Sequence, residues 1–134
     1  LLEESKKHPE SVITGSRFKS GIKNRSIPPI NFAGNIIFSF IWSKVMRVEF
    51  LDILCGSKIV LVSDLKTLPR NIVENDYYGD ISILYAAIIN RRFIRSLDVN
   101  YKKRQFGKTK VRPMIGGLRI FKSMYFCGKH WLKM

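Results

Sequence analysis

The sequence predicts a mainly β domain: a small β-barrel or sandwich over residues 32–90, preceded by a basic extended arm (1–31) and followed by a basic helix and an extended tail (91–134). Apolar runs are concentrated in the middle of the chain, where turn residues separate them. The charge lies at the ends: residues 1–31 carry six Lys/Arg and three acids, residues 32–90 carry five and six, and residues 91–134 carry thirteen and one. A length of 134 residues fits one domain.

Residues 1–31 are predicted to form an arm without regular structure. Ser, Gly, Lys and Arg alternate there with single apolar residues, and no period of 3.6 or 2 is sustained. Pro28-Pro29 then favours extended backbone and removes two hydrogen-bond donors. These two prolines mark the expected boundary between the arm and the core.

The core is predicted to begin with an antiparallel meander of three strands. Asn35–Trp42 is rich in β-branched and aromatic residues, as strands are. Val45–Leu51 is the second expected strand, although a helical turn is an alternative because the alternation over Leu51–Leu54 is imperfect. A turn over Cys55–Lys58 leads to a short apolar strand, Ile59–Val62.

Three weaker signals complete the core. Leu68–Val73 is predicted to be a weak strand or an extended loop, and Asn75–Asp80 a loop. Ile81–Ile89 is the last strongly apolar run.

The basic C-terminal part is predicted to be a helix followed by a tail. Within Asn90–Gln105, four apolar residues follow the spacing of one helix face: Phe93, Ile94, Leu97 and Tyr101. Gly107 would end this helix. Lys108–Met134 is expected to be a tail with hinges at Pro113 and Gly116-Gly117.

No residue set points to catalysis, so we expect no enzyme activity, no cofactor and no metal. No nucleophile elbow, zinc-protease motif or phosphate-binding loop sequence is present. Glu74, Asp76 and Asp80 form an acidic cluster that is interpreted as a solvated loop rather than a magnesium site.

The two cysteines are interpreted as free thiols. Cys55 and Cys127 are far apart in sequence and neither lies in a Cys-x-x-Cys pair. Cys127 and His130 have a ligand-like spacing, but a structural zinc site needs four ligands. The most apolar window, Asn35–Trp42, is too short for a transmembrane helix of about 20 residues.

The basic ends predict a polyanion partner, and nucleic acid is the commonest polyanion for a protein of pI about 10.1. Lysine and arginine neutralise phosphates and release counterions. The interleaved aromatic residues of the tail either stack on unpaired bases or pack on protein. The residues predicted to bind RNA are Arg17, Lys19, Lys23, Arg25, Arg91, Arg92, Arg95, Lys102, Lys103, Arg104, Lys108, Lys110, Arg112 and Arg119.

Several short segments occur in a fixed order: Ala33-Gly34-Asn35-Ile36-Ile37-Phe38, Arg47-Val48-Glu49-Phe50-Leu51-Asp52-Ile53-Leu54, Ile59–Val62, Leu68-Pro69, Tyr77-Tyr78, Val99–Lys103, Gly116–Phe121 and His130–Met134. In this order they resemble the eukaryote-specific protein six of the large ribosomal subunit, which is distinct from the universal protein of that number. The chain lacks two of the family's features. Trp42–Met46 replaces a basic Gly-containing turn, and Ser63-Asp64-Leu65 replaces a Gly-Pro-Phe segment.

The resemblance implies an SH3-like barrel with basic extensions, bound to rRNA in the large (60S) subunit of the cytoplasmic ribosome. The expected partners are large-subunit rRNA and neighbouring ribosomal proteins, with no membrane and no homo-oligomer. The alternatives are an RNA-binding protein of another ribosomal family, including that of an organelle, and a basic peripheral membrane protein.

Overall fold

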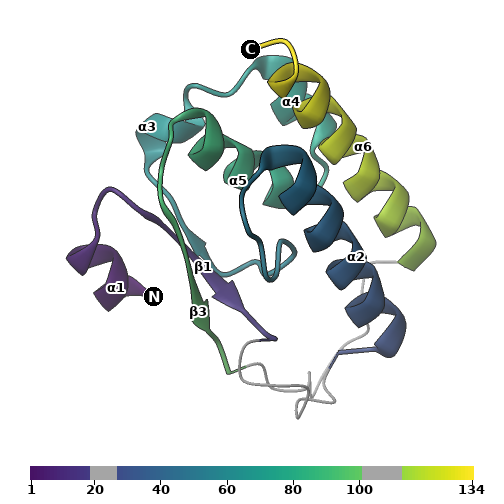
Figure 1. Ribbon diagram of the computed structural model, residues 1–134, viewed down its shortest axis with the longest axis horizontal. Helices are drawn as coiled ribbons and strands as arrows, with labels where there is room; N and C mark the ends of the chain where they lie inside the picture. Colours follow the sequence, from purple (N-terminus) through teal and green to yellow (C-terminus); the bar gives the residue numbers. More distant parts are fainter. Residues whose placement is uncertain (19–26, 101–112) are drawn as a thin grey trace.

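The mainly β prediction is wrong, because most of the residues that the structure describes lie in helices. The computed structural model describes residues 1–18, 27–100 and 113–134. Within these ranges there is no closed barrel, and the three strands form a small open sheet (Figure 1). The elements in chain order are α1 (Leu2–Lys7), β1 (Val12–Ser16), α2 (Pro29–Met46), β2 (Lys58–Ile59), α3 (Val62–Leu65), α4 (Arg70–Asn75), α5 (Asp80–Ile89), β3 (Ile94–Asp98) and α6 (Pro113–Trp131).

The predicted N-terminal arm contains the central strand of the sheet. The strand order is β2-β1-β3, with β1 antiparallel to β2 and parallel to β3. Every residue of β1 is buried. A strand covered on both faces shows no alternation of apolar and polar residues, and β1 is short and contains small residues, so its sequence resembles that of a flexible arm.

Glycine is required at position 15 of β1. A Cβ atom at this position would lie 2.8 Å from Cγ1 of Val99 and 2.9 Å from Sγ of Cys55. The neighbouring chain segments can approach β1 this closely only because glycine has no side chain.

The first two predicted strands are also wrong, because Asn35–Trp42 lies inside α2 and the segment after Met46 is irregular. The buried residues of α2 are Asn35, Ser39, Trp42 and Met46, which recur at helical spacing. This period includes two polar residues, so it is hidden in the sequence by the isoleucine and phenylalanine run between them. Pro28-Pro29 does not continue an extended arm, since Pro29 is the first residue of the helix, a position that proline favours.

The elements between α2 and β3 are also more helical than predicted. The expected strand Ile59–Val62 is reduced to the two residues of β2, and Val62 begins α3. Leu68–Val73 is mostly helix α4 rather than extended chain, whereas a loop does join α4 to α5 as expected. The apolar run Ile81–Ile89 is helix α5.

The C-terminal predictions are wrong where the structure describes this part of the chain; residues 101–112, with Tyr101 and the predicted helix end at Gly107, lie outside the described residues. The expected helix over Asn90–Gln105 contains strand β3, which pairs with β1 from Val12↔Ile94 to Ser16↔Asp98. The expected tail contains α6, the longest helix among the described residues. Pro113 begins this helix, and Gly116 and Gly117 lie inside it rather than acting as hinges.

The core lies where α2, α5 and α6 pack together. Trp42 and Tyr85 are fully buried there and are among the largest buried side chains. From α6, Ile120, Met124 and Cys127 complete the cluster. Elements from the predicted arm, core and tail therefore contribute to one packed body.

Candidate nucleic-acid interface

Two arginines that were predicted to bind RNA instead hold the fold together. Arg17 follows β1 and makes a bidentate ion pair with Asp52: Nε donates to Oδ2 at 2.7 Å and Nη2 donates to Oδ1 at 2.8 Å. The Asp52 side chain is fully buried, and Asn35 also donates a hydrogen bond to it. The pair fixes the irregular segment after α2 against the end of β1.

Arg92 has a similar internal role. Its Nε donates to Oδ2 of Asp64 at 3.0 Å and its Nη2 donates to Oδ1 at 2.9 Å, and the Asp64 side chain is almost fully buried. The hydrogen bonds with Asp64 raise the pKa of Arg92. This ion pair connects the segment before β3 to helix α3.

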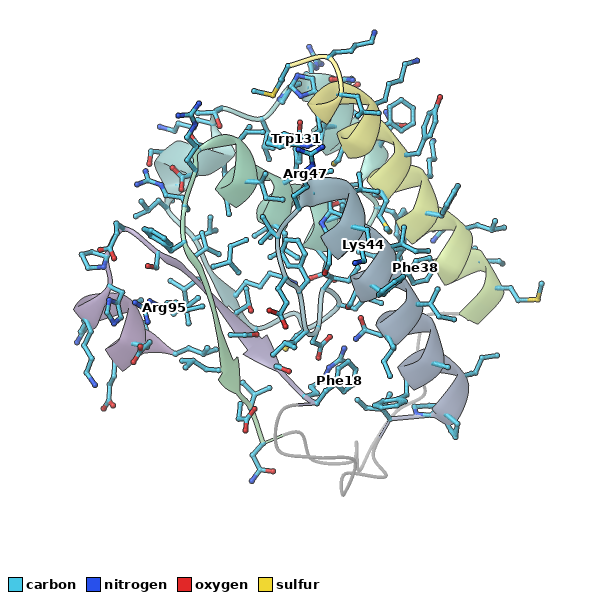
Figure 2. All side chains as sticks on the ribbon, viewed as in Figure 1. Phe18, Phe38, Lys44, Arg47, Arg95 and Trp131 are labelled. Carbon is cyan, nitrogen blue, oxygen red and sulfur yellow. The ribbon has the colours of Figure 1, made fainter. Side chains whose placement is uncertain are left out.

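Three other predicted RNA-binding residues do face solvent. Arg91 is exposed and adopts a left-handed backbone conformation (φ 53°) two residues after the end of α5. Arg95 is exposed on β3 (Figure 2). Arg119 is exposed on α6, with its guanidinium carbon 3.7 Å from the ring centroid of Tyr77. These three cations are accessible to phosphates.

The other nine predicted residues lie outside the described ranges: Lys19, Lys23, Arg25, Lys102, Lys103, Arg104, Lys108, Lys110 and Arg112. The ends that flank them are described. Because β1 and β3 are parallel, Ser16 and Asp98 lie side by side at one end of the sheet. Figure 1 shows that α2 begins in the lower part of the view, where β1 and β3 end, and that α6 begins higher, at the right-hand edge. Two stretches of sequence rich in Lys and Arg therefore connect the same end of the sheet to the starts of two helices.

Sequence reasoning missed several exposed cations. Lys6 and Lys7 lie on α1, Lys44 lies on α2 and Arg47 ends it, and α6 adds Lys122 and Lys129. The only signal in the sequence was that these residues are charged. The helix that carries Lys44 was predicted to be two strands, with Lys44 between them, and the helix that carries Lys122 was predicted to be a tail, so their exposed faces were not recognised.

The predicted acidic cluster is divided among separate partners. Glu74 accepts a hydrogen bond from Arg70, and Asp80 forms an ion pair with Lys58. Asp76 accepts hydrogen bonds from the Ser82 amide and the Ser123 hydroxyl. Among the described residues, no group of three or more His, Cys, Asp or Glu side chains could hold a metal ion.

The thiol of Cys127 is unsuited to nucleophilic chemistry. Burial, with a smaller contribution from Asp76, raises its pKa to about 12. His130, three residues later, does not join it at a metal site, because His130 Nδ1 lies 2.6 Å from the hydroxyl of Tyr85 in a hydrogen bond. Burial also raises the pKa of Tyr85 to about 12. Both cysteines are buried and free, in agreement with the expected free thiols.

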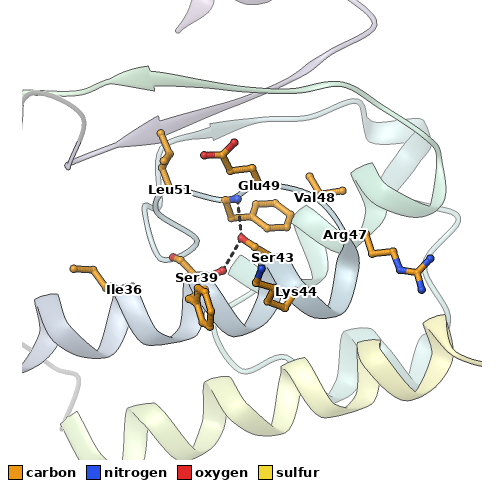
Figure 3. Close-up of a pocket in the computed structure, with 10 residues that line it drawn as sticks. Ile36, Ser39, Ser43, Lys44, Arg47, Val48, Glu49 and Leu51 are labelled. Carbon is orange, nitrogen blue, oxygen red and sulfur yellow. Dashed lines mark hydrogen bonds between the residues drawn. The ribbon is translucent and has the colours of Figure 1, made fainter.

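An open pocket of about 580 Å³ lies beside the C-terminal half of α2 (Figure 3). Its lining is mainly apolar, and Lys44, Arg47 and Glu49 are the charged residues in it. The two serines in the lining are already engaged: the Phe50 amide donates to Ser43 Oγ at 2.9 Å, and the Ser43 hydroxyl donates to the Ser39 carbonyl at 2.7 Å. The pocket therefore adds exposed cations but no catalytic arrangement.

Comparisons with protein-family models, curated proteins and solved structures find no match to this chain. In the part of the chain that the structure describes, no helix is long and apolar enough to cross a membrane.

Proposed function

We propose that this chain binds RNA as a structural component of a ribonucleoprotein particle, and that the large ribosomal subunit is the particle to examine first. The observation that carries the proposal is an imbalance of exposed charge. All ten acids lie in the described ranges, and only five of them are exposed, whereas twelve of the Lys/Arg residues in these ranges are exposed. Asp52, Asp64 and Asp80 are paired internally with Arg17, Arg92 and Lys58, which are not among the exposed cations, so these three acids do not neutralise the exposed surface.

The sequence adds nine cations and no acid in the two stretches 19–26 and 101–112. Both stretches begin at the end of the sheet where Ser16 and Asp98 lie side by side, and both lead to the start of a helix. Helix N-termini favour negative charge because of the helix dipole. Phosphates of an RNA backbone would be attracted both by the positive ends of these two helices and by the cations that the sequence carries in the two stretches.

The likeness to the large-subunit family does not support this proposal, because the barrel that it implies is absent from the described residues. The proposal depends on the charge distribution instead. The ribosome is chosen for the first test because small, strongly basic proteins with several faces of cations are typical partners of folded RNA.

Sedimentation of the full chain in sucrose gradients at high salt tests the proposal. We expect the protein to migrate with the large subunit and to return to the top of the gradient after ribonuclease treatment. Migration with a different particle, released by ribonuclease, would support RNA binding and reject the large subunit. A chain that stays at the top in both samples would contradict the whole proposal.

A further inference from the structure

We infer that the pocket beside the C-terminal half of α2 binds an unstacked base of single-stranded RNA together with its phosphate. This inference rests on the proposed function and deepens it, because it names the part of the RNA that one surface of the chain would recognise. The surface is separate from the predicted RNA-binding residues that face solvent, since none of Arg91, Arg95 and Arg119 lines the pocket.

The pocket is built by the way in which α2 ends. Arg47 follows the last residue of the helix and has a left-handed backbone conformation (φ 56°), and the chain then turns back beside α2 (Figure 3). Two hydrogen bonds hold the returning segment to the helix: the Phe50 amide donates to Ser43 Oγ at 2.9 Å, and the Ile53 amide donates to Ser39 Oγ at 3.3 Å. Because both sides are fixed, the pocket is formed before a ligand binds.

The pocket offers an exposed aromatic ring among apolar side chains. Phe40 is 62% exposed, and Ile36 and Leu51, which also line the pocket, are 47% and 40% exposed. Unpaired bases stack on such rings, and this stacking tolerates any sequence because every base has a π-face. The volume of about 580 Å³ is in the range of small-molecule sites and is sufficient for one base.

A cation lies next to this ring. Lys44 Nζ is 5.5 Å from the centroid of the Phe40 ring, and the Phe40 side chain is still more than half exposed. Arg47 is a second exposed cation of the lining and lies at its edge (Figure 3). A nucleotide joins an aromatic base to a phosphate, so its two parts match the ring and the ammonium group beside it.

Other ligands would use only part of the pocket. Inorganic phosphate would meet Lys44 and Arg47 but leave the apolar walls without a partner. A long acyl chain needs an enclosed cavity, because ligand sites bury about 70–90% of a bound molecule, whereas this pocket is open. A base tolerates an open pocket, since its faces stack and its edges are polar. A peptide with aromatic and acidic side chains shares some of this chemistry and is a competing outcome of the test.

The test uses the full-length chain and two fluorescein-labelled probes that carry the same number of phosphates. One is a short single-stranded oligouridylate, and the other is the matched abasic oligomer. Fluorescence anisotropy measures binding. Phe40→Leu removes the ring and keeps an apolar side chain. Phe93→Leu is the control, because Phe93 is 73% exposed just before β3 and does not line the pocket.

We expect the parent chain to bind oligouridylate more tightly than the abasic oligomer. Phe40→Leu should weaken the binding of oligouridylate about fivefold or more and leave that of the abasic oligomer unchanged. Phe93→Leu should bind both probes like the parent chain. Lys44→Gln should weaken the binding of both probes, because it removes a phosphate contact and keeps the ring.

Photo-crosslinking of the parent chain locates the base without any variant. The oligouridylate carries iodouridine, which reacts with aromatic side chains under ultraviolet light, and mass spectrometry identifies the attached residue. We expect the crosslink at Phe40. Crosslinks confined to residues outside the pocket lining would overturn the inference.

The anisotropy measurements separate this inference from the proposed function. Equal binding of the two probes by the parent chain, or oligouridylate binding that Phe40→Leu leaves unchanged, would overturn the base pocket and leave RNA-backbone binding in place. Binding of neither probe would contradict the proposed function as well. Displacement of oligouridylate by a peptide of alternating phenylalanine and glutamate, lost in Phe40→Leu, would also overturn the inference and make a protein segment the occupant.

Discussion

Arg17 shows how the local context of a charged residue decides its role. In the sequence it stands in a basic stretch, next to Phe18, and resembles a phosphate ligand. In the structure its guanidinium pairs with Asp52, which is 35 positions away in the sequence. No local pattern predicts such a partner. No local pattern predicts the pairing of Arg92 with Asp64 either. Arg95, by contrast, was predicted to be accessible, and it is exposed.

Loss of the Arg17 side chain should destabilise the protein rather than weaken RNA binding. Arg17→Ala leaves the buried Asp52 carboxylate without its main counter-charge, and breaking a buried pair in this way costs about 3–5 kcal/mol of unfolding free energy. Arg95→Ala, at an exposed site, should change it by no more than about 0.5 kcal/mol. Urea unfolding measures both variants. Similar unfolding midpoints for the two would show that the ion pair does not support the fold.

The stability of the protein should fall as pH rises from about 9 to about 12. Burial raises the pKa of Cys127 from 9.0 to about 12, so the unfolded thiol loses its proton first. At pH values below the pKa of Cys127 in the unfolded chain, this contribution to stability is fully present. It is lost as pH rises towards the pKa of Cys127 in the folded protein. Cys127→Ala should unfold with a weaker pH dependence than the parent chain. Parallel pH profiles for the two chains, measured by urea unfolding, would contradict this expectation.

At the scale of the elements, β-propensity misled the prediction of α2. Ile36, Ile37 and Phe38 are typical strand residues, yet the buried positions recur with a helical period. Conversely, Phe93, Ile94 and Leu97 have helical spacing, but pairing with β1 places Ile94 and Leu97 in a strand. Long-range packing overrode local preference in both cases. The loop that joins α4 to α5 was predictable because its signals are local.

Two glycines should respond in opposite directions to alanine. Gly15→Ala places a Cβ within 3 Å of Val99 and Cys55 in the buried central strand, so we expect it to destabilise the protein by about 1–3 kcal/mol. Gly34→Ala adds a Cβ in open space within α2 and should stabilise it by about 0.5–1 kcal/mol. Thermal and urea unfolding of both variants check this. A neutral Gly15→Ala would mean that the segments around β1 can move apart at little cost.

At the scale of the whole molecule, the charge imbalance was visible in the sequence but the body that carries it was not. The sequence indicated a neutral middle with basic ends, and this suggested a core with separate extensions. In the structure β1, β3 and α6 come from those ends and complete the sheet and the core. Strand β1 is too short, and α6 too rich in glycine and charge, for either to be recognised from local patterns.

The salt dependence of RNA affinity tests the central claim most directly. The full chain is titrated with a labelled single-stranded oligonucleotide over a range of salt. We expect the logarithm of the affinity to fall linearly with the logarithm of the salt concentration. Combining Arg91→Gln and Arg95→Gln should reduce the magnitude of this slope by about 0.7 for each phosphate that the variant no longer neutralises. An affinity that does not change with salt, or a slope that the two substitutions leave intact, would contradict RNA binding through these exposed cations.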